Sequence, residues 1–202
     1  MYGNVGDAGT KILIEKKYSI LNKYYTKQYL DKMYDELCDG ENAPSLFISG
    51  INKSEEFKYI IDKNWLNSTV IDSIKIGKGG VLAALWKITE RNKMGIEYKM
   101  AAMPINQVVV EITNFFNINP YRLYSNNSYL LVLSEKIENN INVQKSNYSF
   151  LVDIFYNFKL IANSINSKKK IRIDNDSKSY LTRCYKDELE VVLPNYLNDK
   201  IC

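Results

Sequence analysis

The 202-residue sequence contains no histidine. This absence excludes serine–histidine and cysteine–histidine nucleophiles as well as metal sites built on imidazole. Cysteine is scarce too, because Cys38, Cys184 and Cys202 are odd in number, far apart and never arranged as Cys-x-x-Cys. The spacing predicts neither a disulfide framework nor a zinc site. Much hydrolase chemistry is therefore closed to this chain.

Long apolar runs are also missing, and no stretch approaches the length that crosses a bilayer. Residues 1–7 are neither basic nor apolar, so we expect no signal peptide and a cytoplasmic protein. The length suits one domain spanning residues 1–202. We expect it to be organised as N-terminal helices, a motif-bearing core, a divergent remainder and a tail, at residues 1–40, 41–134, 135–193 and 194–202.

Strong charge of one sign is lacking as well, with 27 basic and 23 acidic side chains and a net charge of +4. One short basic run, Lys168-Lys169-Lys170, precedes an expected strand, where lysines commonly keep a sheet edge solvated. The sixteen tyrosines are scattered and no RNA-binding motif frames them. We therefore expect no nucleic-acid partner and no membrane partner.

The most distinctive stretch is a glycine turn, Gly77-Lys78-Gly79-Gly80, between a β-branched segment and an apolar helical pattern. Unpaired N–H groups at such a helix start could bind a phosphate or another anion, with Lys78 beside it. The alternative is that the glycines allow strand and helix to pack closely, which needs no ligand. Because the motif has the spacing of neither a P-loop nor a dinucleotide fingerprint, the packing alternative is favoured.

Hydrophobic periodicity predicts an α/β (α+β) fold, with a mixed β-sheet and packed helices. We expect Thr26 to cap the second helix, Gly95 to end the central helix, and Pro104 to be the first residue of the next one. Trp86 and Ile112 should be largely buried. The predicted helices are 8–25, 27–39, 52–64, 79–93 and 104–116, and the predicted strands are 69–76, 96–100, 128–134 and 169–174.

Several blocks occur in an order typical of a known family. They are Gly-Asp-Ala-Gly-Thr at 6–10, Gly-Gly-Val-Leu-Ala-Ala-Leu-Trp at 79–86, Gly-Ile-Glu at 95–97, Met-Pro-Ile at 103–105, Phe-Asn-Ile-Asn-Pro-Tyr-Arg-Leu at 116–123, the segment 125–132 and Asp-Glu-Leu at 187–189. Together they resemble the C-terminal domain of the AIR-synthase-like (PurM-like) superfamily. The nearest branch is that of AIR-synthase-related and hydrogenase-maturation HypE proteins. The resemblance implies a mixed sheet flanked by helices, in a family that uses ATP to activate its substrates.

Two departures from the family pattern matter for function. The resemblance does not extend to the N-terminal domain, which in the family carries the magnesium and nucleotide ligands, so we expect these 202 residues to lack it. Where the family commonly has Asp-x-Thr-x-Gly-Gly, Lys75 replaces the acid and Gly77 replaces the hydroxyl residue. Both changes remove oxygen ligands. We therefore expect the chain on its own to have no catalytic residue, no metal site and no cofactor. ATP and magnesium would bind only if a partner completes the site.

Two functional hypotheses follow. In the first, the chain is a non-catalytic pseudoenzyme that acts as a binding or assembly module, and a second copy or a partner protein covers the face left by the missing domain. In the second, it is the C-terminal half of a split ATP-dependent AIR-synthase-related or hydrogenase-maturation enzyme. HypE proteins end in a cysteine that carries the carbamoyl group, so Cys202 could be a terminal thiol carrier or simply a terminal residue.

Overall fold

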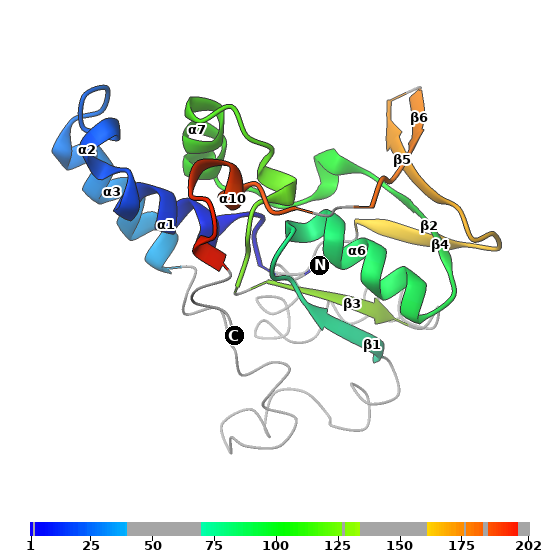
Figure 1. The fold of residues 1–202 in the computed structure, drawn as a ribbon. Coiled ribbons are helices and arrows are strands. Elements are labelled where there is room, and N and C mark those ends of the chain that lie inside the picture. Colours follow the sequence, from blue (N-terminus) through cyan, green and yellow to red (C-terminus); the bar gives the residue numbers. More distant parts are fainter. Residues whose placement is uncertain are drawn as a thin grey trace, which may run out of the picture.

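The computed structural model describes residues 1, 3–39, 70–126, 128–133, 161–175, 177–183 and 186–197. Within these ranges the chain is a mixed α/β structure, as predicted (Figure 1). Its helices are α1 (Asp7–Lys16), α2 (Tyr18–Leu21), α3 (Lys27–Asp39), α6 (Gly80–Arg91), α7 (Gln107–Phe115) and α10 (Leu189–Val192). Its strands are β1 (Val70–Lys75), β2 (Gly95–Tyr98), β3 (Tyr129–Leu133), β4 (Ala162–Ile165), β5 (Lys170–Asp174) and β6 (Ser177–Tyr180). Two 3-10 turns, η3 (Met100–Ala102) and η4 (Pro120–Arg122), complete the described elements.

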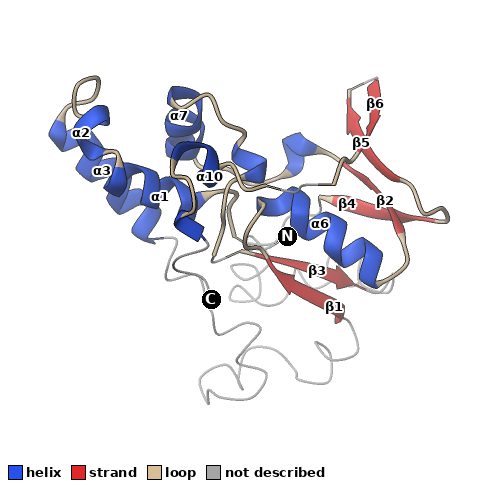
Figure 2. Ribbon diagram, in the orientation of Figure 1, coloured by secondary structure: helices blue, strands red, loops and turns tan. Residues whose placement is uncertain are grey.

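The described strands form two sheets. One has the order β4-β2-β5-β6, in which β2 and β5 are parallel and the outer pairs are antiparallel. The other is the antiparallel pair β1 and β3, in which Ile74 lies opposite Leu130. Helix α6 lies beside both sheets, while α1, α2, α3, α7 and α10 gather at the other end of the molecule (Figure 2). We call α6 with the strands the sheet half, and the other helices the helical half.

The sheet half is built around the apolar stripe of α6. Val81, Leu85 and Ile88 are all less than 5% exposed and belong to one cluster with Ile96 of β2 and Leu130 of β3. The helix is therefore buried along most of its length. Burying a side chain of this size contributes about 2 kcal/mol, so the stripe is the main reason that α6 docks here.

The helical half has a second apolar cluster, which includes Leu13 of α1, Leu30 of α3 and Ile112 of α7, each 0% exposed. Leu197 is also buried in this cluster, so the first residues of the expected C-terminal tail pack against the helices. Ile105 contacts both clusters. The two halves therefore share an apolar boundary.

Helix boundaries differ from the prediction at two places. The helix expected over residues 8–25 is broken at Lys17, whose backbone N–H still bonds Leu13 but whose φ of −115° is not helical. The helix expected from Pro104 begins at Gln107, because the segment before it is extended at Asn106 and the Pro104 carbonyl accepts the Val5 N–H. In contrast, Thr26 caps α3 as predicted, its Oγ1 accepting the Tyr29 N–H at 3.3 Å.

The prediction that Gly95 ends the central helix is wrong, and the reason is steric. Lys93, with a φ of 53°, takes the left-handed position after α6, while Gly95 is the first residue of β2. A Cβ atom on Gly95 would lie 1.8 Å from the Ser167 carbonyl oxygen. The residue is therefore required for close strand approach rather than for a helix cap.

Burial was predicted correctly for Ile112 but overstated for Trp86, which is only partly buried at the edge of its cluster. Its ring lies beneath the Lys170 ammonium, which is 4.5 Å from the ring centroid. Strand β6 was not anticipated, since its sequence Ser-Lys-Ser-Tyr is exposed and carries little strand signal. The predicted helix 52–64 and Cys202 lie outside the described residues.

Candidate functional site

The glycine turn before α6 adopts a backbone that only glycine tolerates easily. Gly79 and Gly80 have φ angles of 84° and 64°. A Cβ on Gly80 would lie 2.5 Å from the Tyr121 carbonyl oxygen in η4. Gly77 differs, since a Cβ added there would have no neighbouring atom within 4 Å. The close-packing alternative thus has a physical basis at Gly80, where the helix start touches the backbone of η4.

The N–H donor at the start of α6 is held by a carboxylate of the same chain. Asp187, which is 1% exposed, accepts the Gly79 N–H on Oδ2 at 2.5 Å. Its other oxygen, Oδ1, accepts the Leu189 N–H at 2.8 Å and the Tyr124 N–H at 3.1 Å. One buried carboxylate therefore joins the glycine turn, the segment after η4 and the start of α10.

A second acidic side chain holds the lysine of the turn. Lys78 Nζ donates to Glu190 Oε1 at 2.5 Å, and the Glu190 side chain is only 10% exposed. The two groups expected to attract an external anion, the helix N-terminus and Lys78, thus both contact carboxylates from residues 187–190. An added phosphate would have to compete with these internal anions.

Burial raises the pKa of Asp187 above the ordinary aspartate value, and the nearby Glu190 charge raises it further. The three backbone N–H donors act in the opposite direction, because they stabilise the ionised form. Desolvation is the larger effect. The fold therefore keeps the Asp187 carboxyl at the turn even though burial disfavours its ionised form.

A second polar cluster lies at the start of α1, in the Gly-Asp-Ala-Gly-Thr segment. The Asp7 carboxylate accepts the Asn106 Nδ2 at 3.1 Å and the Asn4 Nδ2 at 3.2 Å. Burial raises the pKa of Asp7 to about 6, although both amide donors lower it. The Gly9 N–H bonds the carbonyl of Tyr124, the residue whose own N–H bonds Asp187. The start of α1 therefore lies beside the segment that Asp187 holds.

The remaining sequence-predicted features are placed as follows. Lys75 is exposed at the end of β1 and Gly77 follows it without a neighbouring constraint. Among the described residues there is no group of three or more His, Cys, Asp or Glu side chains positioned to hold a metal ion. No helix in the same ranges is both long and apolar enough to cross a membrane.

Sequence reasoning missed the part that residues 187–190 play at the turn. Asp187 was noted only as a piece of a family block, while its contact with Gly79 spans 108 positions. A local signal was present, because an aspartate two residues before Leu189 can accept that residue's N–H. No sequence signal connects it to Gly79.

Comparison with known proteins supports the fold. No family model matches the sequence, and no curated protein matches it either. Among solved structures, E. coli HypE, a hydrogenase maturation protein, aligns with a TM-score of 0.55 and 15% identity over 92% of this chain and 49% of its own. A chain of the HypE–HypF complex gives 0.54 and 15% over 90% of this chain and 50% of its own. Thiamine monophosphate kinase from Aquifex aeolicus is more distant, at 0.48 and 14%, over 86% of this chain and 48% of its own.

The chain therefore has a fold similar to part of the HypE structures, and it spans about half the length of the HypE chains that it matches. At identities this low the similarity shows the fold alone.

Proposed function

We propose that this chain is a non-catalytic PurM-like module that binds a partner protein or a second copy of itself. The observation that carries the proposal is the occupation of the glycine turn by Asp187 and Glu190. A phosphoryl-transfer site needs donors and cations directed at the phosphates. Here the Gly79 N–H and Lys78 contact carboxylates of the chain itself.

Partner binding is supported by apolar surface exposed on the smaller sheet. Ile71 on β1 is 63% exposed, on a strand whose described pairing is with β3 alone. A two-stranded pair is marginal by itself, which favours additional cover on this side.

The first test measures nucleotide binding by calorimetry with magnesium-ATP. We expect no affinity in the micromolar range and no hydrolysis for the native chain, since Asp187 and Glu190 already neutralise the turn. A Glu190→Gln variant, which removes one carboxylate from the turn, should gain weak binding of inorganic phosphate. The matched control is Glu188→Gln, two positions away, which should gain none. Micromolar magnesium-ATP binding by the native chain would contradict the proposal.

The second test measures association by analytical ultracentrifugation at micromolar concentration. A self-associating module should sediment as a dimer or larger species whose fraction grows with concentration. A module that uses a separate partner should be a monomer alone and shift in the presence of a protein carrying the other half of a PurM-like fold.

The alternative, a split ATP-dependent enzyme, is favoured by one observation, the near-equal division of the matched HypE chains at 49–50% coverage. In that case a partner would supply the nucleotide and magnesium ligands, and Cys202 could carry an activated group. The test mixes this chain with a protein that carries the other half of the longer fold and measures ATP hydrolysis. Its result distinguishes the enzyme from the binding module. Hydrolysis that appears only in the mixture and is lost in a Cys202→Ser variant would favour the enzyme.

A further inference from the structure

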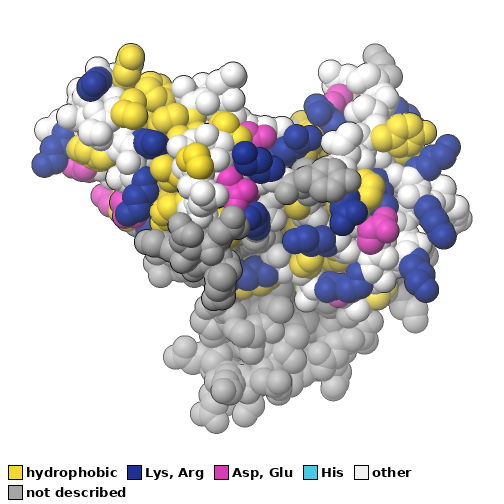
Figure 3. Space-filling model, in the orientation of Figure 1, with side chains coloured by type: hydrophobic (Ala, Val, Ile, Leu, Met, Phe, Trp, Pro, Cys, Tyr) yellow, Lys and Arg dark blue, Asp and Glu magenta, His cyan; other side chains and the backbone are white. Residues whose placement is uncertain are grey.

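Charge is distributed very unevenly between the two ends of the chain. Residues 3–39 contain six Lys and six Asp or Glu, a net charge of zero. The described residues from 70 to 197 contain 14 Lys or Arg and eight Asp or Glu, a net charge of +6. Figure 3 shows basic side chains gathered over the sheet half with few acidic ones between them, while the helical half is mostly apolar with mixed charges.

Glu90, near the end of α6, is the carboxylate in the basic part of this surface that pairs with Lys170. Lys170 Nζ donates to Glu90 Oε1 at 2.5 Å, and this lysine side chain is 8% exposed. The charges of Arg183 and Lys168 also act on Glu90, and together with Lys170 they hold the pKa of that carboxyl below its usual range. Lys87, one turn earlier on α6, is exposed and lies on the same helix face. Glu90 is thus paired with Lys170 and lies within the electrostatic influence of Arg183 and Lys168.

We propose that this surface, formed by Lys87, Lys168, Lys170 and Arg183 around Glu90, binds an acidic segment of a protein partner. The inference rests on the proposed function, since it names the chemistry of the partner for that module. Complementary charge across an interface steers encounter and fixes orientation. A carboxylate of the partner would take the place of Glu90 on Lys170, which leaves the buried ammonium paired in both states.

The same surface is a poor match for nucleic acid, the other polyanion that it could attract. Binding of single strands uses exposed aromatic faces on which bases stack. The Trp86 ring lies beneath the Lys170 ammonium and is only partly exposed. Tyr180 is 66% exposed, but it lies opposite Ile171 in the register, on the sheet face away from Lys170. The exposed Tyr180 ring and Lys170 therefore lie on opposite faces of the sheet, and the Trp86 ring is covered by the Lys170 ammonium.

The test is fluorescence anisotropy of the full chain with a labelled oligoglutamate peptide, and in parallel with an oligothymidylate of equal charge. The peptide should bind at low ionic strength and weaken as salt is added. The double variant Lys87→Glu with Lys168→Glu should weaken peptide binding by about tenfold, since each exposed charge pair contributes a fraction of that. Glu90→Gln should tighten binding by roughly threefold, because it removes the internal competitor.

The matched control is Lys23→Glu with Lys27→Glu, two exposed lysines of the helical half, which changes the net charge equally. If this control weakens binding as much as the double variant at Lys87 and Lys168, net charge alone explains the binding. The assignment of the binding site to this surface is then wrong. Tighter binding of the oligothymidylate, or no effect of Glu90→Gln, would also overturn the proposal. Melting curves of all variants confirm that each is folded. If the peptide does not bind, the proposal of an acidic partner is wrong but the proposal of a non-catalytic module stands. If the native chain hydrolyses ATP, the module proposal is wrong, and the peptide titration is unaffected.

Discussion

The two halves of the molecule are held together by different interactions. In the described helical half, ion pairs join near neighbours, Lys16 with Glu15 and Lys32 with Glu36, and the helices contact one another through apolar and aromatic side chains. In the sheet half, ion pairs join elements far apart in sequence, such as Lys170 with Glu90 and Lys178 with Glu97. Long-range hydrogen bonds, such as that from Asn106 to Asp7, also occur in the helical half, so the difference lies in the ion pairs, which are local there and long-range in the sheet half.

The junction between the halves has both apolar packing and specific long-range polar contacts. Ile105 packs against both apolar clusters, and Asp187 bonds Gly79 on one side and Tyr124 and Leu189 on the other. Mutations at such positions should reveal whether the halves unfold together. Those confined to one half should report its own stabilising interactions.

The largest effect is expected for Gly95→Ala in the sheet half. The new Cβ would lie 1.8 Å from the Ser167 oxygen and 2.6 Å from the Lys169 oxygen, and both are backbone atoms that cannot rotate away. The β2–β5 pairing would have to shift, at a cost of about 3 kcal/mol or more. Urea unfolding followed by circular dichroism measures the loss.

The matched control for this variant is Gly77→Ala. No atom lies within 4 Å of a Cβ at Gly77, and its φ is not in the left-handed region. The substitution should leave stability unchanged or raise it by about 0.5 kcal/mol, because it restricts the unfolded chain. If both variants lose stability equally, close strand approach is not what requires Gly95.

The next effect in size is expected for Asp187→Ala, which removes one of the polar links between the halves. Three backbone N–H groups, those of Gly79, Tyr124 and Leu189, would lose their acceptor at a site that is 1% exposed. The expected cost is about 3 kcal/mol, and unfolding should separate into two transitions. Glu188→Ala is the control and should be nearly neutral. A single transition with an unchanged midpoint would show that the Asp187 carboxylate is not needed to couple the halves.

The comparison also explains what the sequence could and could not predict. Helices α3, α6 and α7 follow from apolar spacing and from a local cap at Thr26, and the mixed sheet follows from β-branched segments. The role of Gly95 was missed because the clash that requires glycine comes from Ser167, 72 positions away. The occupation of the glycine turn was missed for the same reason, since Asp187 and Glu190 approach it only in the folded chain. Local pattern predicts elements, and it does not identify partners that folding brings together.

A smaller and pH-dependent effect is expected for Asp7→Asn in the helical half. Burial raises the pKa of Asp7 to about 6 in the folded chain from 3.8. The native state therefore binds an extra proton between these values, so the contribution of Asp7 to stability is full below about pH 4 and is lost as pH rises through 6. Relative to Asp7→Asn, the native chain should lose roughly 2 to 3 kcal/mol between pH 4 and pH 7.

Urea midpoints of both proteins at several pH values measure that difference. The comparison with the variant is needed because burial lowers the pKa of the Met1 amino group to about 6, an effect of opposite sign. Asp31→Asn, at an exposed position on α3, is the control. A difference between native chain and Asp7→Asn that stays constant from pH 4 to pH 7 would contradict the assigned titration.

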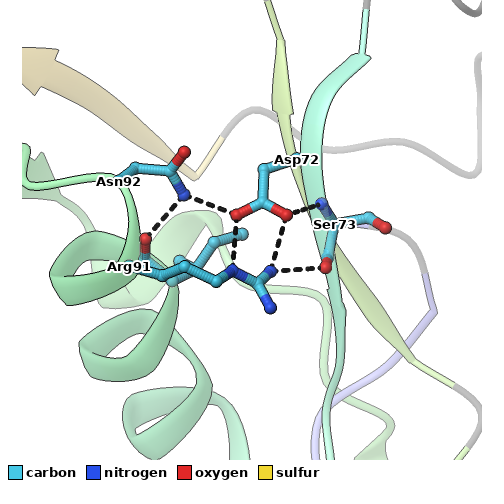
Figure 4. A network of polar contacts seen from close by, with 5 residues as sticks. Asp72, Ser73, Arg91 and Asn92 are labelled. Carbon is cyan, nitrogen blue, oxygen red and sulfur yellow. Dashed lines mark hydrogen bonds and ion pairs between the residues drawn. The ribbon is translucent and has the colours of Figure 1, made fainter.

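The smallest effect compares one ion pair from each half. Arg91 on α6 donates Nε and Nη2 to the two oxygens of Asp72 on β1 at 2.7 and 2.6 Å, and Nη2 also bonds the Ser73 carbonyl (Figure 4). Because this bidentate contact holds both side chains in place, a double-mutant cycle over Arg91→Ala and Asp72→Ala should give a coupling energy of about 1 kcal/mol. Arg91→Lys should retain only part of that energy. The Lys32–Glu36 pair has a single contact at 3.8 Å with both side chains exposed, and the same cycle should give a few tenths of a kcal/mol that vanish in high salt. Equal coupling energies for the two pairs would mean that long-range ion pairs do not distinguish the sheet half from the helical half.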